Sequence, residues 1–69
     1  MNREQVTSST VASLGYDAGT MTLEVEFVTG FVYQYFDVPE FEYQNLVTAE
    51  SIGRYFNQNI RNSYRYGRI

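Results

Sequence analysis

Cysteine, histidine, lysine and tryptophan are all absent from this chain of 69 residues. Zinc fingers, thiol catalysis, serine-histidine triads and lysine Schiff bases each need one of these residue types and are therefore excluded. Only carboxylates, hydroxyls and arginines are left for chemistry. We therefore expect no catalytic residue, no metal site and no cofactor.

Long apolar stretches are absent as well, which argues against a membrane span. The first nine residues contain no apolar segment of the kind found in signal peptides. Together these features predict a cytoplasmic protein without a membrane partner. The composition, 43% hydrophobic with seven Tyr and five Phe, is typical of one small globular domain over residues 1–69. We expect flexible ends at about residues 1–5 and 67–69.

Charge is distributed unevenly along the chain. All eight acidic residues lie within residues 1–50, where Arg3 is the single base, whereas the other four arginines lie within residues 51–69. The net charge of −3 argues against tight, non-specific binding to a phosphate polymer. A local basic patch at the C-terminus is one interpretation. The alternative is that these arginines pair with acids of the first fifty residues or with helix C-terminal carbonyls.

Alternating residues predict strands over residues 11–16 and 21–28, and aromatic and β-branched residues predict a third antiparallel strand over residues 31–36. The segment Asp17 to Thr20 contains the Asp and Gly that a tight turn needs, and Thr29-Gly30 predicts the second turn. The three strands therefore form a meander.

The register of the last two strands depends on the length of the second turn. With a two-residue loop, Phe27 faces Val32, and Tyr33 and Tyr35 share a face with Glu24 and Glu26. The opposite face is then the predicted core face, with Gln34 as its exception; it carries Leu23, Val25, Phe27, Val32 and Phe36. A three-residue loop would exchange the two faces of the third strand only.

Two short helices follow. Pro39 suits the first helical position, and the first helix is predicted over about Pro39 to Val47, with an apolar stripe formed by Tyr43, Leu46 and Val47. Ser51 is the predicted N-cap of the second helix, whose stripe consists of Ile52, Tyr55, Phe56 and Ile60. The predicted fold is α+β, a three-stranded antiparallel β-meander packed with two short helices. The C-terminal segment is either a further edge strand or a loose tail.

Several short motifs, in order and spacing, resemble the KTSC domain: Val6-Thr7-Ser8-Ser9, Gly15-Tyr16-Asp17, Tyr33-Gln34-Tyr35, Val38-Pro39, Gly53-Arg54-Tyr55-Phe56-Asn57 and Ile60-Arg61. The resemblance covers nearly the whole chain. The family is named from the C-terminus of some lysyl-tRNA synthetases, also occurs as small separate proteins, and has a central Tyr-x-Tyr. It implies a module of unsettled role, for which RNA binding has been suggested, and it supplies no catalytic residue.

The candidate site residues form two groups. Tyr33 and Tyr35, two apart on one strand, make a platform on which unstacked bases can lie, or else they pack against another segment. The second group combines guanidinium groups with aromatic rings and consists of Arg54, Arg61, Tyr64, Arg65, Tyr66 and Arg68. Glu24 and Glu26 would repel phosphates if they shared the face of the Tyr pair.

These features predict a non-catalytic binding module whose partner is RNA, either tRNA or a single strand. The alternative is a protein-protein interaction or self-association module, in which an exposed aromatic face or an unpaired edge strand recruits another chain.

Overall fold

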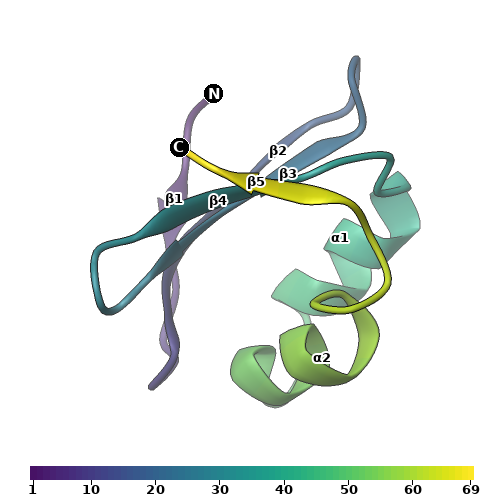
Figure 1. Ribbon diagram of the computed structural model, residues 1–69. Helices are drawn as coiled ribbons and strands as arrows, with labels where there is room; N and C mark the ends of the chain where they lie inside the picture. Colours follow the sequence, from purple (N-terminus) through teal and green to yellow (C-terminus); the bar gives the residue numbers. More distant parts are fainter.

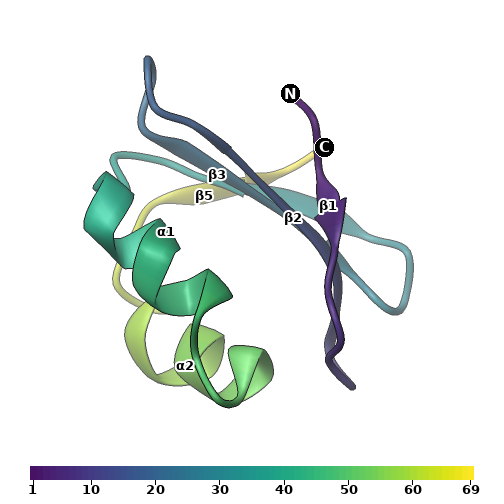
Figure 2. The ribbon, with the colours of Figure 1, turned by 180° about the vertical axis from the view of Figure 1, so that it is seen from behind.

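A computed structural model describes residues 1–69 as one antiparallel sheet with two helices on one of its faces (Figures 1 and 2). The strands follow each other in the order β1-β2-β3-β4-β5. The elements are β1 (Glu4–Gln5), β2 (Val11–Asp17), β3 (Thr22–Phe27), β4 (Val32–Tyr35), α1 (Glu40–Val47), α2 (Ile52–Asn59) and β5 (Tyr66–Arg68). The predicted α+β meander with two helices is confirmed. The C-terminal segment adds β5 at one edge, and β1 forms the other edge.

The turn between β3 and β4 sets the register of the sheet. Its loop has three residues, because Phe27 N–H donates to Phe31 O and Gly30 N–H donates to Phe27 O, both at 2.9 Å. Gly30 closes the turn with φ of 98°, a conformation that glycine adopts without steric cost. As a result Val25 lies opposite Tyr33, and Leu23 lies opposite Tyr35.

This register corrects the face assignment made for a two-residue loop. Tyr33 and Tyr35 lie on the same face as Leu23 and Val25, because directly opposite residues of an antiparallel pair point to the same side. Val32 lies instead opposite Glu26, on the other face. The predicted grouping of the two tyrosines with the acidic side chains is therefore wrong, and the three-residue alternative is right.

The helices begin and end much as predicted. Pro39 is the N-cap of α1, and the Ser51 hydroxyl accepts a hydrogen bond from Arg54 N–H at 3.2 Å at the start of α2. Between the helices and the sheet lies one core cluster, formed by Val11, Leu14, Leu23, Val25, Tyr35, Val38, Leu46, Ile52, Phe56 and Ile60. Neither helix is long and apolar enough to cross a membrane.

The face of the sheet away from the helices is polar and acidic. Glu24 is buried there, accepts a 3.0 Å hydrogen bond from the Gln34 amide and pairs with the Arg3 guanidinium. Ser13 donates to Glu26 at 2.8 Å. Gln34 was the polar exception on the predicted core face. It lies instead on the face away from the helices, where its amide donates to the Glu24 carboxylate.

Candidate ligand-binding pocket

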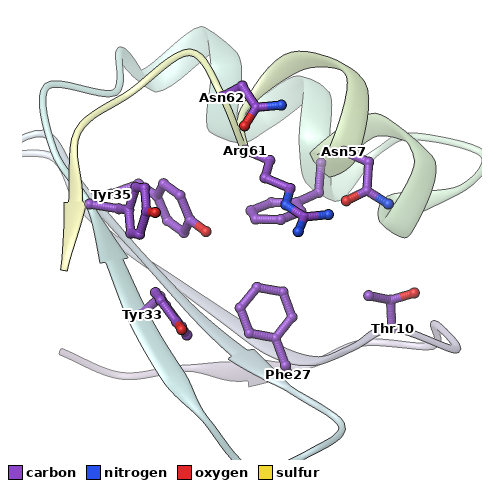
Figure 3. A pocket seen from close by; sticks show the side chains of 9 residues that line it. Thr10, Phe27, Tyr33, Tyr35, Asn57, Arg61 and Asn62 are labelled. Atoms are coloured by element: carbon purple, nitrogen blue, oxygen red, sulfur yellow. The ribbon is translucent and has the colours of Figure 1, made fainter. Parts of the chain in front are cut away.

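A pocket of about 480 Å³ opens between the helix side of the sheet and the C-terminal end of α2 (Figure 3). Phe27, Tyr33 and Thr10 line it from the sheet side, and Asn57 and Arg61 line it from the helix side. Its volume lies within the range of about 300 to 1,000 Å³ that is usual for small-molecule sites. The complete lining is Thr10, Phe27, Tyr33, Tyr35, Phe56, Asn57, Arg61, Asn62 and Tyr66.

Aromatic rings form most of the apolar wall. Phe27 packs edge-on against Tyr33 and Phe56, with ring centroids 5.7 and 5.4 Å apart. Tyr35 packs edge-on against Phe56 at 5.3 Å and lies 5.6 Å from Tyr66. These are favourable aromatic pair geometries that hold the rings in place. The ring contacts therefore fix the orientation of the aromatic side chains, which present flat surfaces to a ligand.

Hydrogen-bond donors gather in the same pocket. Burial raises the pKa of the Tyr35 hydroxyl to about 12, the nearby Tyr33 and Tyr66 hydroxyls add to the rise, and the Arg61 charge opposes it. The Tyr35 hydroxyl therefore keeps its proton at neutral pH and acts as a donor. Arg61 adds a fixed positive charge, and no acidic residue lines the pocket. Such a site favours an acceptor-rich, anionic ligand.

The aromatic and basic surface continues beyond the pocket along the sheet edge. Tyr66 lies opposite Tyr35 and Arg68 lies opposite Tyr33, so both point to the helix side of the sheet. The Arg68 guanidinium lies over the Phe31 ring, 5.0 Å from its centroid, which is a cation-π distance. We call the nine pocket residues with Phe31 and Arg68 the aromatic-arginine surface.

Comparison with known proteins identifies the family. The KTSC domain family matches residues 7–64. The chain belongs to the KTSC domain family. A crystal structure of a KTSC domain protein from Yersinia pestis is similar to this chain with a TM-score of 0.94 at 39% identity, covering 99% of this chain and 96% of that one. This KTSC domain thus shares its fold with a solved member over nearly its full length.

Sequence relatives of this KTSC domain are of two kinds. An uncharacterized protein from Stutzerimonas stutzeri is 47% identical over 70 residues, covering 100% of this chain and 99% of its own length. A lysine-tRNA ligase from Nostoc punctiforme is 34% identical over 61 residues, which covers 88% of this chain but only 11% of the ligase. The family match indicates no catalytic class. No group of three or more His, Cys, Asp or Glu side chains is placed to hold a metal ion.

The KTSC fold brings together five of the eight residues singled out from the sequence. Tyr33, Tyr35, Arg61 and Tyr66 line the pocket, and Arg68 extends the same surface. Glu24 and Glu26 do not share their face, because these carboxylates lie on the other side of the sheet. These carboxylates therefore do not repel phosphates from the face that carries the tyrosine pair.

The other three lie apart from this surface. Arg54 lines a separate hollow beside Glu50 on the N-terminal half of α2. Tyr64 donates a 2.9 Å hydrogen bond to Glu42. Arg65 pairs with Asp37 at 2.8 Å, as the alternative interpretation of the C-terminal arginines predicts. These side chains serve helix packing and surface pairing rather than the pocket.

Six residues of the aromatic-arginine surface are not among the eight candidate site residues: Thr10, Phe27, Phe31, Phe56, Asn57 and Asn62. The sequence pattern predicts Phe27 and Phe56 as core residues, and their rings pack against each other. Thr10 lies just before β2, in a segment with no pattern of its own. The only signal in the sequence that pointed toward this grouping was the three-residue alternative for the second turn.

Proposed function

We propose that this KTSC domain is a non-catalytic module that binds single-stranded RNA on the aromatic-arginine surface. The observation that carries the proposal is the joint presence of aromatic rings and unpaired guanidinium groups on one face, with the paired carboxylates on the other. Proteins that bind single strands combine these two features, stacking bases on rings and neutralising phosphates with cations.

The exposure of the rings suits stacking. Tyr66 and Phe31 are 60% and 53% exposed. Tyr33 and Phe27 are half-buried and pack against each other. Each base stacked on such a ring contributes about 1 to 3 kcal/mol. Two or three stacked bases would therefore supply about 2 to 9 kcal/mol, compared with about 8 kcal/mol for a micromolar affinity.

The charges support weak, selective contact with phosphates. Arg61 and Arg68 form no ion pair, whereas Arg3 and Arg65 are paired with Glu24 and Asp37. Two phosphate contacts on a single strand give a slope of roughly −1.4 for log affinity against log salt. The binding should therefore be only modestly sensitive to salt, as the net charge of −3 also implies.

The pocket lining also supports a binding role rather than catalysis. It contains amides, hydroxyls, rings and one guanidinium, with no carboxylate. No carboxylate, imidazole or thiol lines the pocket to activate one of its hydroxyls as a nucleophile. The ligase relative places a similar segment within an enzyme that, by its name, acts on tRNA, which makes tRNA the first RNA to test.

The test is an amide-shift map of isotope-labelled protein, titrated with tRNA and with short single-stranded RNA at low and physiological salt. We expect shifts at Tyr33, Tyr66, Arg61 and Arg68 that weaken with salt. Arg68→Gln should reduce affinity severalfold, and Arg54→Gln, which lies outside the surface, is the matched control.

A titration without shifts for any RNA would overturn the proposal. Sedimentation at several protein concentrations would then test the alternative, a protein-interaction or self-association module. The feature favouring that alternative is β5, an edge strand of the sheet beside the exposed Phe31 and Tyr66 rings.

A further inference from the structure

The hydroxyl of Tyr35 lacks the protein hydrogen-bond acceptor that three less buried tyrosine hydroxyls have. Tyr16, Tyr55 and Tyr64 each donate to a carbonyl or carboxylate oxygen of the protein. Tyr35 is only 4% exposed, yet its hydroxyl donates to no protein acceptor. Since no fully enclosed side-chain polar atom lacks a partner, this hydroxyl is reached from the pocket, and Figure 3 shows Tyr35 directed into it.

Arg61 supplies a charge to the same pocket. It lies on the opposite wall of the pocket from Phe27 and Tyr33 (Figure 3), and its charge acts on the Tyr35 hydroxyl. A guanidinium and a protonated phenol are both donors, and no carboxylate of the protein satisfies either one. These two donors of the pocket together match a phosphate, which offers several acceptor oxygens and negative charge.

The rest of the pocket has a different character. Phe27 and Tyr33 provide flat apolar surface, and the Asn57 and Asn62 side chains offer amide donors and acceptors from the opposite wall (Figure 3). A ring with polar edges suits this part, since amides pair with base edges and aromatic rings stack on base faces. The two parts together suit a ligand with one phosphate and one planar polar ring.

From this division we infer that the pocket holds one nucleotide as a unit, its phosphate on Arg61 and the Tyr35 hydroxyl and its base against Phe27 and Tyr33. The inference rests on the proposed function and deepens it, because it separates a specific one-nucleotide pocket from the outer part of the surface around Phe31 and Arg68. A nucleoside monophosphate alone should therefore bind.

The experiment titrates labelled protein separately with adenosine monophosphate, adenosine and inorganic phosphate. We expect the monophosphate to shift the amides of Thr10, Asn57 and Asn62 and to bind at least about tenfold more tightly than adenosine or phosphate, a factor equal to about 1.4 kcal/mol. Equal affinity for adenosine and its monophosphate would overturn the inference.

Variants locate the contact. Tyr35→Phe removes only the hydroxyl and keeps the buried ring, so the core stays filled. We expect it and Arg61→Gln each to weaken binding of the monophosphate about tenfold, which again equals about 1.4 kcal/mol. Tyr43→Phe and Arg54→Gln are the matched controls outside the pocket, and both should leave affinity unchanged. Similar losses in the controls would contradict the assignment.

RNA binding distinguishes the two proposals. If a short RNA binds to wild type and Tyr35→Phe equally, and shifts appear only around Phe31 and Arg68, the one-nucleotide pocket is wrong and the RNA-binding function stands. If neither the monophosphate nor any RNA binds, both proposals fail. The amide spectrum of each variant confirms that the fold is intact before its affinity is compared.

Discussion

Tyr33 lies directly opposite Val25 across the pair of strands β3 and β4. That pairing turns Tyr33 and Tyr35 toward α2 and turns Glu24 and Glu26 away from it. Had the strands slipped by one residue, the tyrosines would have shared a face with the carboxylates, because the side-chain period of a strand is two. The chemical character of the pocket thus depends on this one register.

The register in turn depends on Gly30. Its φ of 98° is unfavourable for any residue with a Cβ, while a Cβ at this place would meet no atom within 4 Å. Gly30→Ala should therefore lower the free energy of unfolding by about 1 to 2 kcal/mol through backbone strain alone. Urea denaturation measures the change. Thr29→Ala in the same turn is the control, and an equal effect of both substitutions would show that strain at Gly30 is not the cause.

Arg3 should matter for stability although it lies near the end of the chain. Its guanidinium pairs with Glu24, whose side chain is 9% exposed, and donates to Ser13 at 3.1 Å. Arg3→Ala leaves a buried carboxylate with Gln34 as its remaining partner, and we expect a loss of about 1 to 3 kcal/mol.

A double-mutant cycle with Glu24→Gln tests the origin of that loss. Once the carboxylate is replaced by a neutral amide, removing Arg3 should cost much less. If Arg3→Ala has the same effect in both backgrounds, the pair with Glu24 is not what stabilises the fold.

Alkaline pH should destabilise this protein in a defined window. Burial raises the pKa of Tyr35 and Tyr64 to about 12 from the usual 10, and for Tyr64 the hydrogen bond to Glu42 adds to the rise. The fold thus favours the protonated phenols. Their contribution is complete below about pH 10 and is lost as the pH rises toward about 12, because the unfolded chain releases these protons first.

Urea midpoints across this range, together with tyrosinate absorbance, measure the effect. Tyr64→Phe should make the decline with pH shallower. Ionisation of all seven tyrosines together near pH 10 in the folded protein would contradict the prediction.

Arg65 should contribute little to stability and little to RNA binding. The side chains of its pair with Asp37 are 76% and 66% exposed, and such exposed pairs contribute about 0 to 1 kcal/mol. Arg65→Ala should therefore change RNA affinity less than Arg68→Ala, whose guanidinium lies over Phe31 on the proposed surface. Binding measured by fluorescence anisotropy for the two variants provides the comparison. A larger loss for Arg65→Ala would move the RNA contact away from the pocket.

Local patterns in the sequence were enough to predict most of the elements and the family. Ser51 caps α2, Pro39 precedes α1, and Leu46, Phe56 and Ile60 enter the core, because capping and helical periodicity act within a few residues. The two-residue strand β1 was missed, because Glu4 and Gln5 are exposed polar residues without an alternating pattern.

The pocket itself was decided only by the tertiary structure. Thr10, Phe27 and Arg61 lie far apart in the chain and meet because the sheet register and the position of α2 bring them together. Residue spacing alone encodes neither the register nor the position of α2. A turn of two residues and a turn of three both fit the segment around Thr29-Gly30, but they direct the side chains of β4 to opposite faces of the sheet. The sequence determined which side chains were available, and the register determined which of them share a face.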